Sequence, residues 1–257
     1  MKTARYFLIG LQTIAALTYL IAPGPLRAAG AAMRIIVDAT EISRDLLHAT
    51  IELPVPKPVT AGQAPALLYP KWVPGAHGPS GPINNFSGLW VRNSAGAEIA
   101  WERDWSDVYR FFLPGSRPGE TVTIRTRYIC NQPNVTSHGI DTYGAETMGV
   151  INWNTVTLYP EGVSSRDIQV NAALVLPTGW SAGSALPVKE RRGDTLFFGT
   201  VNLEQFIDRP LICGEHYRKV ELTNATDAAY YLHLVGEDPG DLPRNDSAYV
   251  PLRRLVR

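Results

Sequence analysis

Several features that would point directly to a function are scarce in this 257-residue sequence. It contains only two cysteines, which excludes a small scaffold held together by several disulfides. Its formal net charge is zero, with 24 basic and 24 acidic residues, so no basic surplus favours nucleic acid as a partner. Apolar residues make up 45% of the chain, which excludes a disordered tail and is typical of a domain with a core.

The usual catalytic motifs are missing as well. None of the histidines lies three or four residues from another, so the sequence has no His-Glu-x-x-His zinc motif. The serine-glycine cluster at 78–81 lacks the Gly-x-Ser-x-Gly spacing of a hydrolase nucleophile, and there is no phosphate-binding glycine loop. We therefore predict no catalytic residue and no metal ligand in this chain. The five histidines are His48, His77, His138, His216 and His233.

The first 31 residues have the pattern of a secretory signal peptide. Lys2 and Arg5 precede a charge-free, mostly apolar run at 7–22, and small residues at 28–31 suit a signal peptidase. The run of about 16 residues is short for a membrane span, which needs roughly 20. We expect cleavage and export to the periplasm or the medium. The chain would then meet a membrane only through this leader, before cleavage.

The rest of the sequence is typical of strands and turns. Residues 121–130 alternate strictly between two faces, and 48–53 place apolar residues on one side only. Residues 89–101 predict a hairpin. The spacing favours an all-β fold, an antiparallel β-sandwich or saddle-like sheet with a short C-terminal helix. We expect one β domain at 32–240, followed at 241–257 by the beginning of a helix.

The two cysteines allow two interpretations. Export would permit a disulfide between Cys130 and Cys213, because disulfides persist in oxidising compartments. Both residues also stand at the ends of apolar strand-like runs, which is equally consistent with two buried free thiols.

One loop is distinctive. It contains Trp72, Pro74, Gly75 and His77, and its prolines make the backbone stiff. We expect Trp72 to serve as a large anchor and Pro74-Gly75 to form a tight turn. Such a loop could face another domain or a substrate, or it could be a purely structural turn buttressed by Trp72.

The loop also carries a family resemblance. Segment 68–75, Leu-Tyr-Pro-Lys-Trp-Val-Pro-Gly, resembles the Trp-x-Pro-Gly signature in the N-terminal domain of the M61 glycyl aminopeptidases. Segment 176–180, Leu-Pro-Thr-Gly-Trp, resembles that domain's Leu-Pro-x-Gly-Trp, and 201–214 resembles its Tyr-x-x-Leu-x-Asp-x-Pro stretch leading to a glycine. The three segments occur in the family's order. One departure is Ala76-His77, where the family commonly has Ser-Tyr.

The resemblance implies a supporting role. Family members are zinc aminopeptidases in which a thermolysin-like helical domain follows the β domain and carries His-Glu-x-x-His. Residues 249–257 resemble the beginning of that domain's first helix. The resemblance thus implies a truncated fragment, inactive alone, with zinc expected only in the missing catalytic domain. Its partner would be the catalytic domain of the same or an adjacent polypeptide.

Two other functions stay open at this point. The chain could be an exported stand-alone module that binds a peptide or a glycan through loop 74–88 and its tryptophans. A third, weaker hypothesis is an enzyme with a new kind of site, built around Cys213 or His77.

Overall fold

The structure is a computed structural model that describes residues 32–73, 77–131, 142–223, 229–243 and 245–256. The predicted signal peptide, 1–31, lies outside the described residues, as does His138. Within the described residues, no helix is both long and apolar enough to cross a bilayer.

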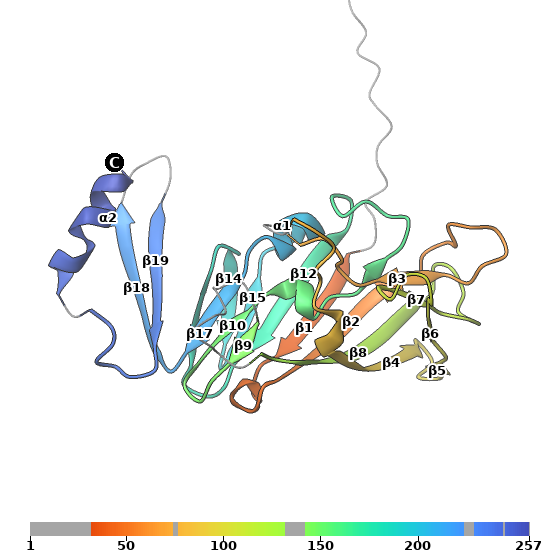
Figure 1. The fold of residues 1–257 in the computed structure, drawn as a ribbon, viewed down its shortest axis with the longest axis horizontal. Helices are drawn as coiled ribbons and strands as arrows, with labels where there is room; N and C mark the ends of the chain where they lie inside the picture. The colour runs from red at the N-terminus through yellow and green to blue at the C-terminus, as the bar shows by residue number, and fades with distance from the viewer. Residues whose placement is uncertain (1–31, 74–76, 132–141, 224–228, 244, 257) are drawn as a thin grey trace, which may run out of the picture.

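One large, mixed sheet runs through the domain (Figure 1). Its strands follow the order β14-β15-β12-β1-β2-β8-β4-β5, and β16 also pairs with β12. The bounds are β1 (Met33–Asp38), β2 (Leu46–Pro54), β4 (Phe86–Asn93), β5 (Glu98–Ile99), β8 (Thr121–Ile129), β12 (Gln169–Val175), β14 (Val188–Arg192), β15 (Thr195–Phe198) and β16 (Val201–Asn202).

Two four-stranded sheets and a hairpin complete the strands. The first small sheet has the order β13-β17-β10-β9 and the second β11-β3-β7-β6, while β18 pairs with β19. Their bounds are β3 (Ala66–Leu68), β6 (Glu102–Arg103), β7 (Arg110–Phe112), β9 (Tyr143–Gly144), β10 (Met148–Ile151), β11 (Tyr159–Pro160), β13 (Ser181–Ser184), β17 (Leu211–Gly214), β18 (His216–Thr223) and β19 (Tyr230–Gly236).

Among the described residues, helix is limited to short pieces. The α-helices are α1 (Leu203–Ile207) and α2 (Val250–Leu255). The 3-10 turns are Ile42–Arg44, Ile83–Asn85, Trp153–Thr155 and Asp246–Tyr249. The predicted all-β class and short C-terminal helix are therefore confirmed. One pairing differs from the expectation, because β1 lies parallel to β12. These strands are far apart in sequence, so no tight hairpin fixes their relative direction.

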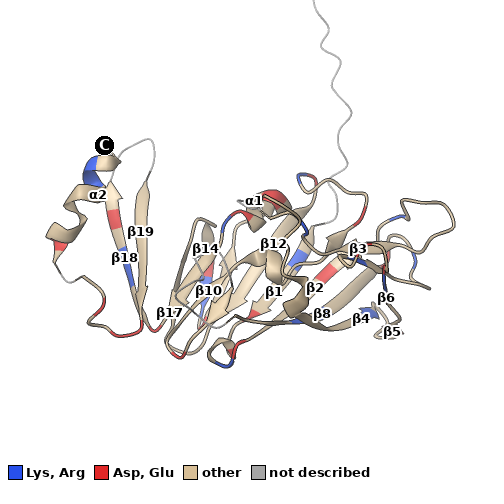
Figure 2. Cartoon of the chain, viewed as in Figure 1, with Lys and Arg blue, Asp and Glu red and all other residues tan. Residues whose placement is uncertain are grey.

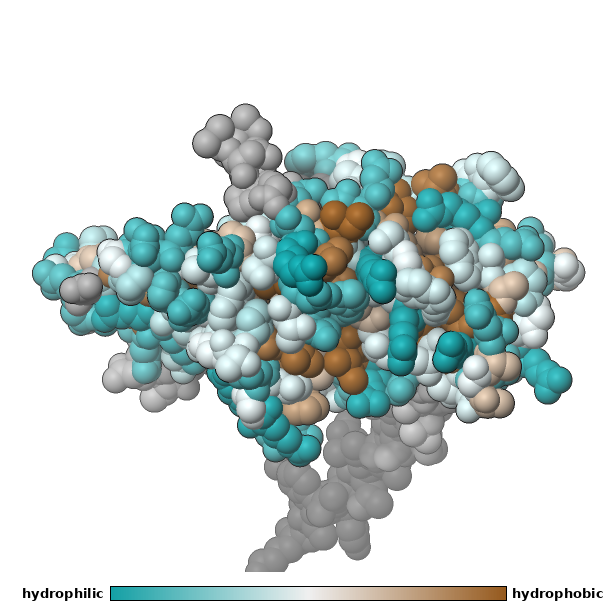
Figure 3. Space-filling model, turned by 90° about the horizontal axis from the view of Figure 1, so that it is seen from below, coloured by the Kyte–Doolittle hydropathy of each residue, from teal (hydrophilic) through white to brown (hydrophobic). Residues whose placement is uncertain are grey.

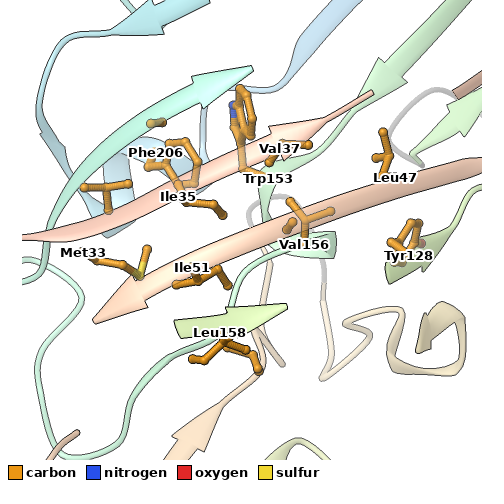
Figure 4. Close-up of a cluster of buried hydrophobic side chains, with 14 of the residues drawn as sticks. Met33, Ile35, Val37, Leu47, Ile51, Tyr128, Trp153, Val156, Leu158 and Phe206 are labelled. Atoms are coloured by element: carbon orange, nitrogen blue, oxygen red, sulfur yellow. The ribbon is translucent and has the colours of Figure 1, made fainter. Parts of the chain in front are cut away.

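Period-two alternation explains why the large sheet has one buried face. In β8, Val122 and Ile124 are fully buried while Arg125 and Arg127 are exposed. Side chains from the inner face form one continuous core with residues of both small sheets. Figure 4 shows this core around β1 and β2, with Trp153 and Phe206 approaching β1 from other segments. Both small sheets therefore cover the same face of the large sheet.

The hairpin β18–β19 stands at one end of the molecule and carries α2 (Figure 1). It packs on the body where the His233 ring lies against Gly183, which leaves no room there for a side chain. The Tyr217 hydroxyl lies 2.6 Å from Nδ1 of His233, and the two rings are stacked 5.9 Å apart. A neutral imidazole can accept a hydrogen bond from that hydroxyl at Nδ1.

We expect the packing of this hairpin to depend on pH. Burial, and secondly Lys219, lowers the pKa of His233 below its ordinary value, so the folded state favours neutral imidazole. The stabilising contribution is thus complete above about pH 6.5, the unfolded value, and is lost as the pH falls through the lower folded pKa. In thermal unfolding between about pH 7.5 and pH 5, His233→Gln should show a flatter stability profile than the unaltered chain. If the two proteins show the same dependence of stability on pH, His233 does not make the packing of the hairpin pH-dependent.

Candidate functional site

The loop singled out in the sequence follows β3 and packs against the turn that precedes β7. We call residues 71–73, 77–83 and 104–109 the corner. Tyr69, just before it, is fully buried, and its hydroxyl donates to the carbonyl of Thr155 at 3.1 Å. The Tyr69 ring also stacks on Tyr109 with centroids 6.4 Å apart. Burial raises the pKa of Tyr69, which keeps the hydroxyl a donor.

Backbone contacts hold the two ends of the loop together. The Gly81 amide donates to the carbonyl of Lys71 at 3.0 Å. The Tyr109 hydroxyl donates toward the carbonyls of Pro79 and Gly81, each at 3.1 Å. A Cβ on Gly81 would lie only 2.0 Å from the carbonyl oxygen of Pro70. Only glycine fits at this crossing.

The charged groups of the corner are paired with one another. Lys71 Nζ lies 2.8 Å from Asp107 Oδ2 and above the Tyr109 ring. Arg110 contacts Asp104 at 3.1 Å and Glu161 at 2.7 Å. Hydrogen bonds from Ser106, and then from Arg110, hold the pKa of Asp104 below its usual range. These carboxylates serve as ion-pair and hydrogen-bond acceptors within the corner and beside it.

Apolar side chains project from the same corner into solvent. Trp105 is fully exposed, at 101% of its reference area, and Val108 and Trp72 are exposed as well. A cavity of about 740 Å³ opens beside Trp105 and Val108. Seen from below, hydrophobic residues reach the surface in separate spots among hydrophilic ones (Figure 3). Trp105 thus presents a large aromatic side chain without protein cover at this corner.

The structure describes only some of the predicted loop residues. Trp72 is 65% exposed, so the expectation that it anchors the loop was wrong. Tyr69 is the anchor, three residues earlier, because it follows β3 directly into the core. His77 is exposed at the loop surface. Pro74 and Gly75 lie outside the described residues.

Sequence reasoning missed Trp105 and Tyr109. Both belong to a second segment that joins the loop only in three dimensions. An exposed aromatic cannot be told from a buried one in a short run without clear alternation.

Both cysteines are buried, free thiols, the second of the two sequence interpretations. Burial, and then the neighbouring Cys130, raises the pKa of Cys213 to about 12. Its thiol points to the carbonyl of Gly149 at 3.6 Å. A buried thiol that stays protonated is a poor nucleophile, so nothing here favours a reactive Cys213.

Metal ligands do not gather in the described part of the chain. No group of three or more His, Cys, Asp or Glu side chains in those residues is placed to hold a metal ion. The described residues therefore offer no set of ligands for a zinc centre.

The three sequence segments noted above occupy structural junctions. The described part of segment 68–75, residues 68–73, leads from β3 into the corner. Segment 176–180 forms the turn after β12, with Gly179 at φ +84° and Trp180 buried. Segment 201–214 contains α1, whose first turn is capped by Asn202 Oδ1 accepting from the Gln205 amide at 2.9 Å. The motifs therefore specify turns and caps of the β domain.

These features define a class of protein: a β domain with one large saddle-like sheet, two small sheets on its inner face, and a solvent-exposed aromatic corner. The model of the peptidase M61 N-terminal domain family matches residues 34–215. The chain therefore belongs to the peptidase M61 N-terminal domain family.

One solved structure supports the fold, and a second shows a weaker similarity. An aminopeptidase N family protein from Idiomarina loihiensis superimposes with a TM-score of 0.69 at 17% identity, over 87% of this chain and 35% of that one. An M1 zinc metallopeptidase from Deinococcus radiodurans, bound to a Tyr-Ser-Ala substrate, has a TM-score of 0.43 at 14% identity, over 87% and 52% of the two chains. This chain thus spans about a third to a half of their lengths. No curated protein matches it.

Proposed function

We propose that this chain is the non-catalytic N-terminal β domain of an M61-type zinc aminopeptidase. In this role it braces the catalytic domain and borders the substrate cleft, and it has no peptidase activity alone. Zinc and the groups that activate water belong to the catalytic domain, in the same or an adjacent polypeptide. We further propose that the protein works outside the cytoplasm, in keeping with the leader at 1–31.

The observation that carries the proposal is the exposed corner on a domain of this family. Trp105 and Val108 stand in solvent beside a cavity of about 740 Å³. Buried anchors such as tryptophan contribute most of the binding energy at protein interfaces. Hydrogen bonds from the Tyr109 hydroxyl to the carbonyls of Pro79 and Gly81 tie the segment next to Val108 to the loop, which lowers the entropy cost of docking. We therefore place the catalytic domain against the corner.

A binding experiment tests this placement. A zinc-loaded catalytic domain of the M61 family is titrated against the chain, followed by calorimetry and by hydrolysis of a glycyl substrate. We expect a defined complex, and we expect Trp105→Ala to weaken it roughly 30-fold, the loss of one strong anchor. Because Trp105 is fully exposed, its replacement should leave the fold intact.

Val188→Asp is the matched control. Val188 is 53% exposed on β14, the strand at the opposite edge of the large sheet from β5. The Val188→Asp variant should bind the catalytic domain with the affinity of the unaltered chain. Equal affinity of the Trp105 variant and the unaltered chain, or no complex at all, would count against the corner as the docking surface.

A further inference from the structure

The outer face of the large sheet, away from the core, carries a groove that the proposed function does not use. It has a volume of about 720 Å³, lies over β2, β8 and β4, and is bordered at one end by the turn between β4 and β5. Because side chains alternate across the sheet, the groove is lined by the residues that β8 and β4 turn away from the core. We call it the β4–β8 groove. The charged positions of these strands are coloured in Figure 2.

A β-bulge turns a tryptophan into this groove. The register between β4 and β8 shifts between Ser87 and Trp90, and Gly88 has a φ of +57° that side chains rarely adopt. The extra residue leaves Leu89 buried and directs Trp90 outward, where it is 42% exposed. The indole lies close over Gly88, and the guanidinium of Arg127 stands 5.1 Å from the indole centre. The fold thus places a cation over one face of a partly exposed indole.

The groove has an excess of positive charge. Arg92 and Arg125 have no ion-pair partner among the described residues, although Glu98 lies opposite Arg92 in the register. The groove also contains one carboxylate, Asp38, which accepts a hydrogen bond from Thr40, and its His48 contacts Glu41 at 2.8 Å. Arginines two residues apart on a strand are about 6.5–7 Å apart, so they present a row of cations rather than one point.

The groups that line the groove indicate whether a peptide or another kind of ligand would fit it. The backbone of β8 is paired with β2 on one side and β4 on the other, so a peptide could find few main-chain partners here. What remains is short hydroxyl and amide side chains, three guanidinium groups and one indole face. The hydroxyl and amide side chains are Thr50, Thr123, Asn93 and Ser94.

We propose that the β4–β8 groove binds a carboxylate-bearing polysaccharide. The guanidinium groups of Arg125, Arg127 and Arg92 would pair with successive carboxylates, since arginine suits planar carboxylates in two-point contact. A sugar ring would lie on the Trp90 indole, and its hydroxyls would meet the polar side chains.

The test uses a galacturonate hexasaccharide, its neutral methyl ester and a hexaglutamate peptide as probes. Calorimetry with the full chain should show binding of the hexasaccharide and none of the ester. Arg125→Gln combined with Arg127→Gln should weaken binding by about tenfold or more, the loss of charge-assisted hydrogen bonds. Trp90→Ala should weaken it as well, and Trp90→Phe should retain part of it.

Arg34→Gln is the matched control. Arg34 lies on the same outer face but already pairs with Glu52 at 3.3 Å, so its variant should bind normally. Circular dichroism and thermal unfolding check that each variant is folded. The proposal is overturned if the hexasaccharide does not bind, if the ester binds equally well, or if the arginine variant keeps full affinity. It is also overturned if hexaglutamate binds as tightly as the sugar, because the occupant would then be an acidic peptide.

Discussion

Trp153→Ala is expected to lower the free energy of unfolding by about 3–5 kcal/mol, the usual cost of deleting a large buried aromatic side chain. Trp153 is fully buried where the inner face of the large sheet meets α1. Its ring stacks on Phe206 with centroids 4.8 Å apart and meets Phe198 edge-on at 5.6 Å. Its indole nitrogen donates to the carbonyl of Arg209 at 2.8 Å. Alanine would leave a cavity and a carbonyl without its donor.

Chemical denaturation of both proteins measures this effect. Since native domains are typically stable by about 5–15 kcal/mol, the variant should be unfolded in part or retain little stability. Trp105→Ala is the control, because a fully exposed tryptophan should change stability by no more than about 0.5 kcal/mol. Equal losses for the two variants would show that Trp153 is not a centre of the core.

Gly81→Ala should be the most damaging single-methyl change at the corner. The new Cβ would lie 2.0 Å from the carbonyl oxygen of Pro70, a backbone atom that cannot rotate away. We expect a loss of about 1–3 kcal/mol or more from overpacking, together with displacement of the loop. The hydrogen bond from the Gly81 amide to Lys71 would be strained as well.

Gly78→Ala provides a control within the same loop. A Cβ at Gly78 meets no atom within 4 Å, so this variant should retain its stability. Thermal unfolding compares the two, and affinity for a catalytic domain shows whether the loop has moved. If the Gly81→Ala variant has the same melting temperature as the unaltered chain, the loop does not cross Pro70 as closely as described.

The strands were predictable where the pattern is local. Alternation along 121–130 predicts β8, and the turn residues at 93–96 predict the hairpin of β4 and β5. The pairing of β1 with β12 was not predictable, because it joins strands far apart in the sequence and runs parallel. Local patterns fix which face of a strand is buried, whereas its partner depends on the whole chain.

The candidate site was predictable only in part. Loop 68–83 stands out in the sequence, but Trp72 looked like its anchor because large aromatics are usually buried. Tyr69 takes that place, and Trp105 joins the surface from a different segment. The β4–β8 groove depends on one extra residue at the Gly88 bulge. This residue moves the side chains that follow it in β4 to the opposite face of the sheet. Such bulges are not visible in an alternation pattern until the partner strand is known.

We propose that this chain supports a metallopeptidase without supplying its chemistry. The most direct test measures glycyl-peptide hydrolysis by the purified chain with added zinc, alone and then with an M61 catalytic domain. The account predicts no zinc-dependent hydrolysis by the chain alone and a clear increase over the catalytic domain alone when the two are combined. Zinc-dependent glycine release by the chain on its own would contradict it.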